Sequence, residues 1–161
     1  MSAPAVDLLL RTQIEDLYAA YCTALDEGPL EAWPELFTEQ CTYQVIPREN
    51  YAAGKPLATL SFESRGMLVD RVFGVRQTLF HQPYAQRHIV TGFRFDALSA
   101  TRVSVEANYL VLRTKHDELA DVLSAGRYFD TVVRQAERLL FEVKRCVFDT
   151  ELIPNSLIYP I

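Results

Sequence analysis

The chain has 161 residues, 49% of them hydrophobic and 23% charged, which are the proportions of a soluble domain of ordinary size. Its net charge is −5 and its 16 Lys and Arg residues are scattered, which excludes a basic nucleic-acid surface and a polybasic membrane patch. No apolar run approaches the roughly 20 residues of a membrane helix, the N-terminus does not read as a signal peptide, and the three cysteines are far apart, so we expect a cytoplasmic protein with reduced thiols.

The first third of the chain has helical spacing. Apolar residues recur at intervals of three and four over 6–25, which predicts a helix with one buried face. Gly28 and Pro29 end this helix, since Gly caps helix ends and Pro cannot continue them. A short second helix is predicted over 30–38, with its aromatic residues Trp33 and Phe37 packed inward together.

A strand and a further helix follow. Alternating residues over 41–48 predict a strand that Pro47 ends. The stretch 49–63 has the composition of a loop, within which 57–62 is compatible with a short strand. Helical spacing returns over 67–80.

After Pro83 the hydrophobic period changes to two. Short polar turns separate the apolar runs, which predicts an antiparallel meander. The last residues, 151–161, are irregular and strongly apolar, so we expect them to dock on their own domain or on a partner chain. The four predicted strands are 87–95, 102–114, 119–133 and 139–150.

Helices that precede a long antiparallel sheet are typical of an α+β domain, and we expect a single domain over 1–161. About three helices packed in a curved, mainly antiparallel sheet suggest, by fold analogy, the cone of the nuclear-transport-factor-2-like (NTF2-like, SnoaL-like) proteins.

The sequence lacks the common motifs of metal and nucleotide chemistry. Its histidines are His81, His88 and His116, and none has the spacing of a zinc or non-haem iron site. Only His81 and His88, seven residues apart, are placed where they could meet. The Rieske cluster motifs, the phosphate-binding glycine loops and the nucleophile elbow are all missing. We therefore predict no metal site, no cofactor and no catalytic residue in this chain.

One pair of side chains offers an alternative. Asp26 at the end of the first helix and His88 on the sheet could converge with Tyr18, Tyr43 or Tyr109 in the mouth of a cone and transfer protons there. The simpler interpretation is that Asp26 caps the helix end and His88 hydrogen-bonds within the sheet. We favour the simpler interpretation, because no spacing in the sequence requires the pocket.

Four stretches carry a family resemblance: YCTALDEGPLEAWPELFTEQCTYQV, the central PRENYAAGKPLATLSFESRGMLVDRVFGVRQTLFHQPYAQRHIV, SAGRYFDTVVR, and the terminal IPNSLIYPI. The helix MLVDRV followed by the strand YAQRHIV is the most specific of these signals. The chain resembles the small (β) subunits of bacterial Rieske-type aromatic-ring hydroxylating dioxygenases. Its tail is most similar to salicylate 5-hydroxylase small subunits, with terephthalate and anthranilate dioxygenase β subunits as neighbours.

The resemblance implies a non-catalytic structural subunit in aromatic acid catabolism. In this family the large α subunit carries the Rieske [2Fe–2S] cluster and the mononuclear Fe(II), and NADH supplies electrons through a reductase and a ferredoxin. The β subunit adds no ligand to either metal and typically assembles with α subunits and other β subunits into an α3β3 hexamer. No catalytic residue is carried over, because these subunits hold none.

Such a subunit needs an adhesive surface rich in aromatic residues and Arg. Two other functions remain open: a self-sufficient isomerase, dehydratase or small-ligand binder that uses Asp26 and His88, and a homo-oligomeric assembly module. The residues expected at subunit interfaces are Arg48, Tyr51, Asp70, Arg71, Tyr84, Arg87, Ile158, Tyr159 and Ile161.

Overall fold

The computed structural model describes residues 6–150 and 157–161. Helix α1 (Leu8–Asp26) begins where the side chain of Asp7 accepts a hydrogen bond of 2.8 Å from the amide of Leu10, and it ends just before Gly28. The predicted helix is thus confirmed with nearly the expected bounds. Its buried face consists of Ile14, Leu17, Tyr18, Tyr21, Ala24 and Leu25.

The predicted helix over 30–38 is wrong. The segment forms two single 3₁₀ turns, η1 (Leu30–Ala32) and η2 (Pro34–Leu36), and the chain is already extended at Phe37. Pro34 explains the break, because it has no amide hydrogen to continue a helix. The inward packing of the two aromatic residues is confirmed: Trp33 and Phe37 have no exposed surface, and their rings meet edge to face at 5.7 Å.

Strand β1 (Phe37–Pro47) ends at the predicted proline but begins four residues earlier than expected. The predicted loop contains a five-residue helix, α2 (Arg48–Ala52), which has no buried residue and therefore left no apolar pattern in the sequence. It also contains strand β2 (Leu60–Phe62). Helix α3 (Arg65–Gln77) starts at the capping side chain of Ser64 and ends three residues before the predicted end.

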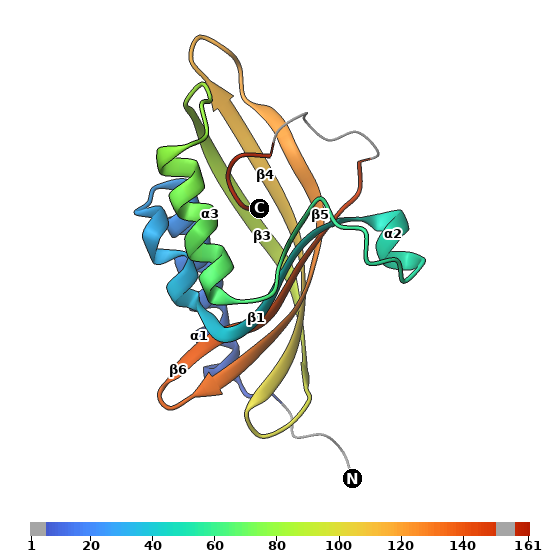
Figure 1. The fold of residues 1–161 in the computed structure, drawn as a ribbon. Helices are drawn as coiled ribbons and strands as arrows, with labels where there is room; N and C mark the ends of the chain where they lie inside the picture. The colour runs from blue at the N-terminus through green and yellow to red at the C-terminus, as the bar shows by residue number, and fades with distance from the viewer. Residues whose placement is uncertain (1–5, 151–156) are drawn as a thin grey trace.

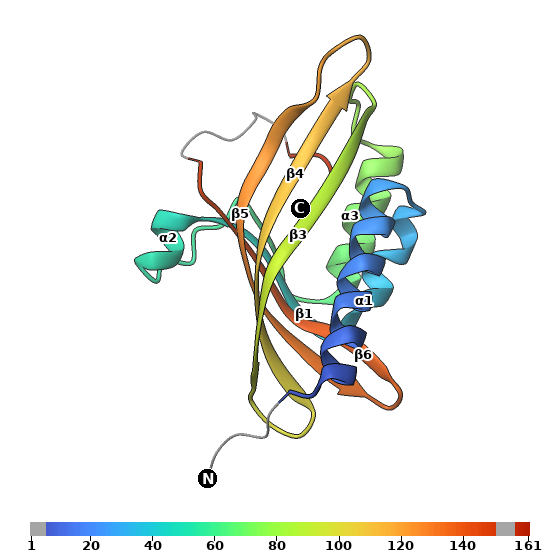
Figure 2. The same cartoon turned by 180° about the vertical axis from the view of Figure 1, so that it is seen from behind.

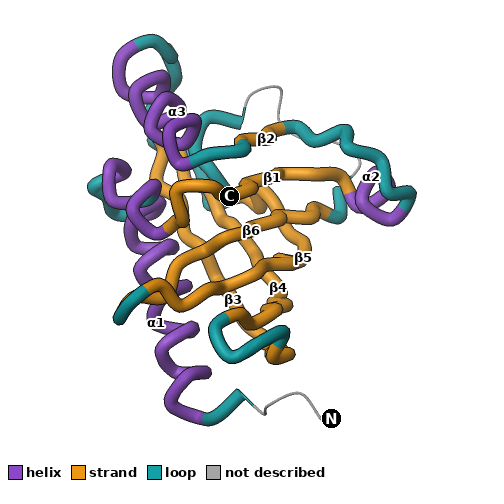
Figure 3. Tube along the Cα trace, turned by 60° about the horizontal axis from the view of Figure 1, so that its bottom comes forward, coloured by secondary structure: helices purple, strands orange, loops and turns teal. Residues whose placement is uncertain are grey.

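The four predicted strands are confirmed as β3 (Tyr84–Ala97), β4 (Arg102–Lys115), β5 (Asp121–Gln135) and β6 (Arg138–Phe148). Each pairs antiparallel with the next, as expected for a meander. The structure adds that β1 pairs in parallel with β6, with Tyr43 opposite Lys144. The six-stranded sheet has the order β2-β1-β6-β5-β4-β3, and Figure 3 shows β1 and β6 side by side.

The sheet is long and strongly curved, and α1 and α3 lie together on one side of it (Figures 1 and 2). One hydrophobic core fills the space between these helices and the sheet. The fold is therefore α+β, as predicted. Ile158 and Ile161 are buried there too, so residues 157–161 of the apolar tail dock on their own domain, while residues 151–156 of the predicted tail lie outside the described residues. Within the described residues, no helix is long and apolar enough to cross a membrane.

Candidate functional site

Asp26 and His88 meet at the end of α1. One carboxylate oxygen of Asp26 accepts a 2.7 Å hydrogen bond from the backbone amide of His88, and the other lies 2.5 Å from Nδ1 of the His88 ring. The favoured sequence interpretation of Asp26 is thus wrong: its carboxylate holds His88 instead of capping the helix. The exposed fraction of the side chain is 0% for His88 and 4% for Asp26.

This geometry fixes the tautomer of the imidazole. A carboxylate only accepts hydrogen bonds, so Nδ1 carries the proton and Nε2 presents its lone pair in the neutral ring. Nε2 is buried and has no hydrogen-bond partner among the residues that the structure describes. His88 lines a hollow of about 240 Å³ between α1 and β3, together with Tyr18, Cys22, Val90 and Phe93. The arrangement has the form of an oriented proton acceptor.

The three tyrosines named with this pair each use the hydroxyl elsewhere. Tyr18 donates to Asp130, Tyr43 contacts the backbone of Ile161, and Tyr109 shares a 3.0 Å hydrogen bond with Ser124. The tyrosine ring beside His88 is Tyr21, with ring centroids 6.2 Å apart in an edge-to-face contact. Sequence spacing alone had not selected Tyr21.

The other histidines lie apart from this pair. His81 packs against Tyr84 and Tyr159, and His116 is exposed beside Asp117. Across residues 6–150 and 157–161, no three His, Cys, Asp or Glu side chains gather where they could hold a metal ion.

A second polar cluster lies inside the core. Lys144 on β6 and Asp130 on β5 form an ion pair of 2.9 Å, and neither side chain has any exposed surface. Asp130 also accepts hydrogen bonds from the hydroxyl of Tyr18 and, at 3.1 Å, from the amide of Arg145. Burial raises the pKa of Asp130, and the Lys144 charge opposes that rise. We regard Asp130 as ionised, because three donors converge on its carboxylate.

Aromatic rings enclose the ammonium group of this lysine. Lys144 Nζ lies 3.4 Å from the ring centroid of Tyr128 and 4.4 to 4.8 Å from three further rings. Such contacts attract a cation to the negative ring faces, which offsets part of the cost of burying the charge. The three further rings are Tyr18, Tyr21 and Phe141.

Residues 157–161 are part of the hydrophobic core. The main-chain oxygen of Ile161 accepts hydrogen bonds from Tyr21, from Tyr43 at 3.2 Å and from the thiol of Cys146 at 3.1 Å. The amide of Ile161 donates to Tyr43 at 2.8 Å. The guanidinium of Arg71 on α3 donates to the carbonyls of Leu157 and Ile158, at 2.5 and 2.8 Å.

Burial keeps these donors protonated. Desolvation raises the pKa values of Tyr21 and Tyr43 well above that of a free phenol. It also raises the pKa of Cys146 to about 12 and that of Cys22 to about 11. The phenols and thiols around Ile161 are therefore neutral hydrogen-bond donors at physiological pH, and none of the thiols has the lowered pKa of a nucleophile.

The residues expected at subunit interfaces divide into two groups. Arg71, Ile158 and Ile161 are committed to contacts within the chain, and Tyr84 packs against Tyr159 with ring centroids 5.4 Å apart. The second group is exposed. Its members are Arg48, which pairs with Asp149, Tyr51, which stacks on Phe129 at 4.9 Å, Arg87, which pairs with Glu27, and Asp70.

Sequence reasoning missed the cluster of Lys144 and Asp130. The available signal was a charged residue at an inward position of each of two strands. Lys144 follows the apolar Val143, and Asp130 lies between Phe129 and Thr131. Strand alternation placed Tyr128 and Asp130 on the same face, so a buried charge could have been inferred there.

Comparison with known proteins places the chain among related sequences and structures. Residues 6–145 match the SnoaL-like domain family. The chain is 36% identical to the anthranilate 1,2-dioxygenase small subunit of Burkholderia cepacia over 149 residues, 92% of each chain. It is 28% identical to the terephthalate 1,2-dioxygenase terminal oxygenase component subunit beta 1 of Comamonas sp., over 92% of this chain and 97% of that protein. A crystal structure of a β subunit assigned to an aromatic-ring-hydroxylating dioxygenase of Novosphingobium aromaticivorans superposes with a TM-score of 0.89 and 34% identity, covering 98% and 100% of the two chains.

Proposed function

Because the chain belongs to the SnoaL-like domain family and, within it, to the small (β) subunits of aromatic-ring dioxygenases, we propose that it is a non-catalytic structural subunit of a terminal oxygenase. The proposed substrate of that oxygenase is an aromatic acid, and salicylate is the first candidate. Residues 1–161 act as one domain in this role. The complex is an oxidoreductase, and this chain supports its assembly.

The observation that supports the non-catalytic role is the packed core around Ile161 and Lys144, between the sheet and the helices. In this core Ile161 is fully buried and hydrogen-bonded to Tyr21 and Tyr43. Deeper in the core, the aromatic rings close around Lys144. A subunit built in this way contributes a rigid body and an outer surface to the enzyme.

We assign both iron centres to the large subunit. The donor chemistry of the described residues does not fit an iron site, because His81, His88 and His116 lie apart from one another and the thiols of Cys41 and Cys146 are buried and protonated. In the proposed complex the α subunit holds the Rieske [2Fe–2S] cluster and the mononuclear Fe(II). NADH supplies electrons through a reductase and a ferredoxin, and three copies of each subunit form an α3β3 hexamer.

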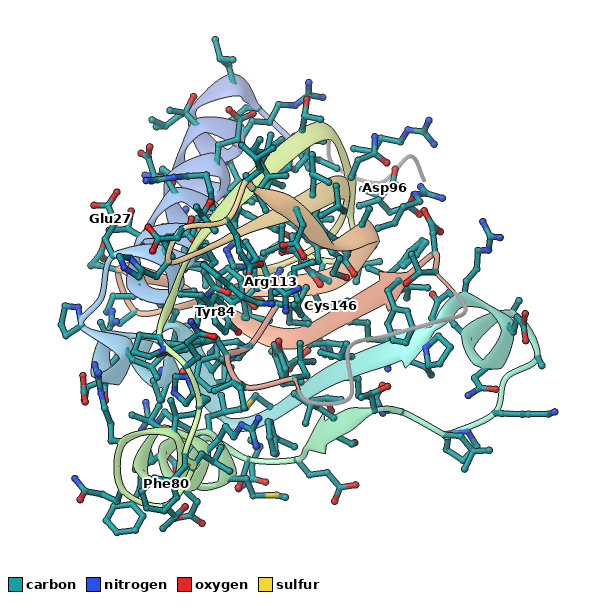
Figure 4. The ribbon with its side chains drawn as sticks, turned by 90° about the horizontal axis from the view of Figure 1, so that it is seen from above. Glu27, Phe80, Tyr84, Asp96, Arg113 and Cys146 are labelled. Carbon is teal, nitrogen blue, oxygen red and sulfur yellow. The ribbon has the colours of Figure 1, made fainter. Side chains whose placement is uncertain are left out.

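The outer face of α3 supports contact with a partner. Val69 and Phe73, four residues apart on this helix, are 51% and 62% exposed, and Phe80 just beyond the helix is fully exposed. Figure 4 shows the Phe80 ring pointing away from the molecule. Exposed aromatic residues that follow one helix face are typical of protein interfaces. We propose this face, which includes the exposed Asp70, as one subunit contact surface, and the regions around the exposed Arg48, Tyr51 and Arg87 as further contact surfaces.

Co-expression with the cognate large subunit tests the proposal. Sedimentation analysis should give a complex with three copies of each chain, and oxygen uptake with NADH and the electron-transfer proteins should be fastest on salicylate, with anthranilate and terephthalate as comparison substrates. An isolated chain that retains stoichiometric iron, or that turns over a substrate without the large subunit, would contradict the structural role. Faster oxygen uptake on either comparison substrate would contradict the assignment of salicylate as the substrate, but not the structural role.

The buried pair of Asp26 and His88 favours a second candidate, an acid–base enzyme that acts on a small molecule. The supporting observation is the unpartnered Nε2 of His88 beside the hollow between α1 and β3. This function predicts that the isolated chain is active and that His88→Gln lowers its turnover by a factor of about 100 or more. The structural role predicts that His88→Gln leaves the turnover per assembled hexamer unchanged.

A further inference from the structure

A hollow of about 220 Å³ lies where the start of α1 meets the turn between β3 and β4. Figures 1 and 2 both show this turn beside the first residues of α1, at the opposite end of the sheet from the turn between β4 and β5. Val103 and Val132, which line the hollow, are only 5% and 1% exposed, whereas Ser99 and Thr101 are exposed. The hollow therefore leads from the surface at the turn toward the hydrophobic core.

The walls of this hollow are mostly aliphatic, so they suit a hydrocarbon ligand. An apolar cavity of about 150 Å³ is large enough to hold benzene. The hollow thus has room for a six-membered ring, or for a hydrocarbon chain of similar size, with one small polar group attached. Its apolar wall residues are Val6, Leu10, Ala97, Val103, Val132 and Leu139.

Arg134 on β5 is the charged residue in the lining of the hollow. Its guanidinium donates a 2.8 Å hydrogen bond to the side-chain amide oxygen of Gln13, which is a neutral acceptor. Arg102, at the start of β4, is by contrast paired with the carboxylate of Glu142. Arg134 has no such partner within residues 6–150 and 157–161, so its charge remains available to an anion.

The acidic residues near Arg134 do not replace such a partner. Asp16 and Glu137 line a separate hollow together with Arg134, but neither forms an ion pair with it in the described part of the chain. Both are exposed, so water and salt weaken their effect on the guanidinium. A carboxylate held against the aliphatic walls is less screened, and its hydrogen bonds with a guanidinium are about twice as strong as those between neutral groups.

We propose that this hollow binds a small hydrophobic carboxylate, with its hydrocarbon part against Val103 and Val132 and its carboxylate on the Arg134 guanidinium. The chain binds the molecule and changes no bond in it. Leu10, which lines the hollow, and Asp26 lie near opposite ends of α1, about 24 Å apart at 1.5 Å per residue. The site is therefore separate from the pair of Asp26 and His88, and it depends on neither function proposed above.

Calorimetric titration of the full chain tests the binding. Benzoate carries a ring and hexanoate a chain, so these two probes distinguish the two kinds of hydrocarbon part. Benzamide and hexanamide have the same shapes without the charge, and acetate has the charge with almost no hydrocarbon. At least one of benzoate and hexanoate should bind about tenfold or more tightly than its own amide and than acetate.

Two variants locate the charge that is responsible. Arg134→Gln should weaken the binding of the preferred carboxylate about tenfold and remove its advantage over the amide. Arg102→Gln is the matched control, because it removes the same charge at the same end of the sheet, from a side chain that is paired with Glu142 and does not line the hollow. It should leave the Kd unchanged.

Measurements on the unmodified chain keep the proposal testable if Arg134→Gln does not fold. In methyl NMR spectra, the preferred carboxylate should shift the signals of Val103 and Val132 and leave those of Val72 on α3 in place. Ala97→Leu, which fills the hollow and keeps every charge, should abolish the binding.

Four results would overturn the proposal. The first is that neither benzoate nor hexanoate binds. The second is that acetate or the amides bind as tightly as the carboxylates. The third is that Arg102→Gln weakens binding as much as Arg134→Gln does. The fourth is that the methyl signals of Val72 shift as much as those of Val103.

Discussion

Lys144 and Asp130 are direct cross-strand partners on β6 and β5, and their 2.9 Å ion pair is sealed from solvent on every side. The pair lies where the rings of Tyr18, Tyr21, Tyr128 and Phe141 come together, so a charge at each position is part of the packing of the core. Removal of one partner would leave the other buried and unpaired, which costs far more than the pair itself contributes.

The first prediction concerns this pair. Lys144→Met should lower the free energy of unfolding by about 3 to 5 kcal/mol, because Asp130 then lacks its counter-charge in a dry core. The double variant Lys144→Met/Asp130→Leu should recover most of the loss. Urea titrations at pH 7 provide the measurement. Arg87→Ala breaks the exposed pair with Glu27 and is the control, with a loss of at most about 1 kcal/mol. Equal losses for Lys144→Met and Arg87→Ala would contradict the buried-charge argument.

The second prediction compares two glycines. A Cβ on Gly126 of β5 would lie 2.0 Å from the carbonyl oxygen of Val147 on β6 and 2.8 Å from Cα of Phe148, both backbone atoms that cannot move aside. We therefore expect Gly126→Ala to destabilise the fold by more than about 2 kcal/mol or to prevent folding. A Cβ on Gly74 of α3 meets only the hydroxyl of Thr78 at 3.7 Å, so Gly74→Ala should stabilise the chain by up to about 1 kcal/mol. Thermal unfolding checks both predictions: the Tm should fall in Gly126→Ala and rise in Gly74→Ala.

The third prediction is a loss of stability at alkaline pH. Burial raises the pKa of Cys22 from 9.0 to about 11, so the folded chain keeps this proton between pH 9 and 11 while the unfolded chain loses it. The free energy of unfolding should therefore fall as pH rises through this window, by at most about 1.4 kcal/mol per pH unit for each such group. The stability is fully present below pH 9. Cys22→Ala should make the fall of the unfolding free energy with pH shallower. An identical pH dependence in the variant and the unmodified chain would contradict the contribution of the Cys22 thiol.

The fourth prediction tests the outer face of α3. Phe73→Asp should leave the isolated chain folded, since the ring is largely exposed, but should weaken its association with the large subunit about tenfold or more. Leu119→Asp, in the hairpin between β4 and β5, is the matched control, because Leu119 is 94% exposed and lies outside the proposed surface. Sedimentation of co-expressed complexes compares the two. Equal assembly of both variants with the large subunit would contradict the placement of the interface on α3.

The sequence predicts the parts of this fold whose pattern is local. Helix α1 has a regular apolar face ended by Gly28 and Pro29, and strand β4 alternates cleanly from Val103 to Val111, so both were predicted with nearly their observed bounds. Helix α2 could not be found in this way, since none of its five residues is buried. The helical spacing of Trp33 and Phe37 wrongly predicts one helix in place of the turns η1 and η2, because Pro34 stands between the two aromatic residues.

The candidate site depends on contacts that sequence periodicity does not encode. Asp26 and His88 could be named as a possible pair, but the orientation of the carboxylate toward the backbone amide and the Nδ1 of His88 follows from the approach of α1 to β3. The tail was expected to dock because it is apolar. That Tyr21, Tyr43 and Cys146 meet at one main-chain oxygen depends on three elements brought together by the sheet, and none of these residues is close to another in sequence.

The parallel pairing of β1 with β6 has a consequence for biosynthesis. While the nascent chain leaves the ribosome, β1 emerges early together with its neighbour β2, whereas its other neighbour, β6, is made after all the other described strands. One edge of β1 therefore stays unpaired until the meander has been made, and long-range pairing of this kind closes slowly. We expect the newborn polypeptide to rely on chaperones during that interval, and production in cells with depleted trigger factor should shift it toward inclusion bodies.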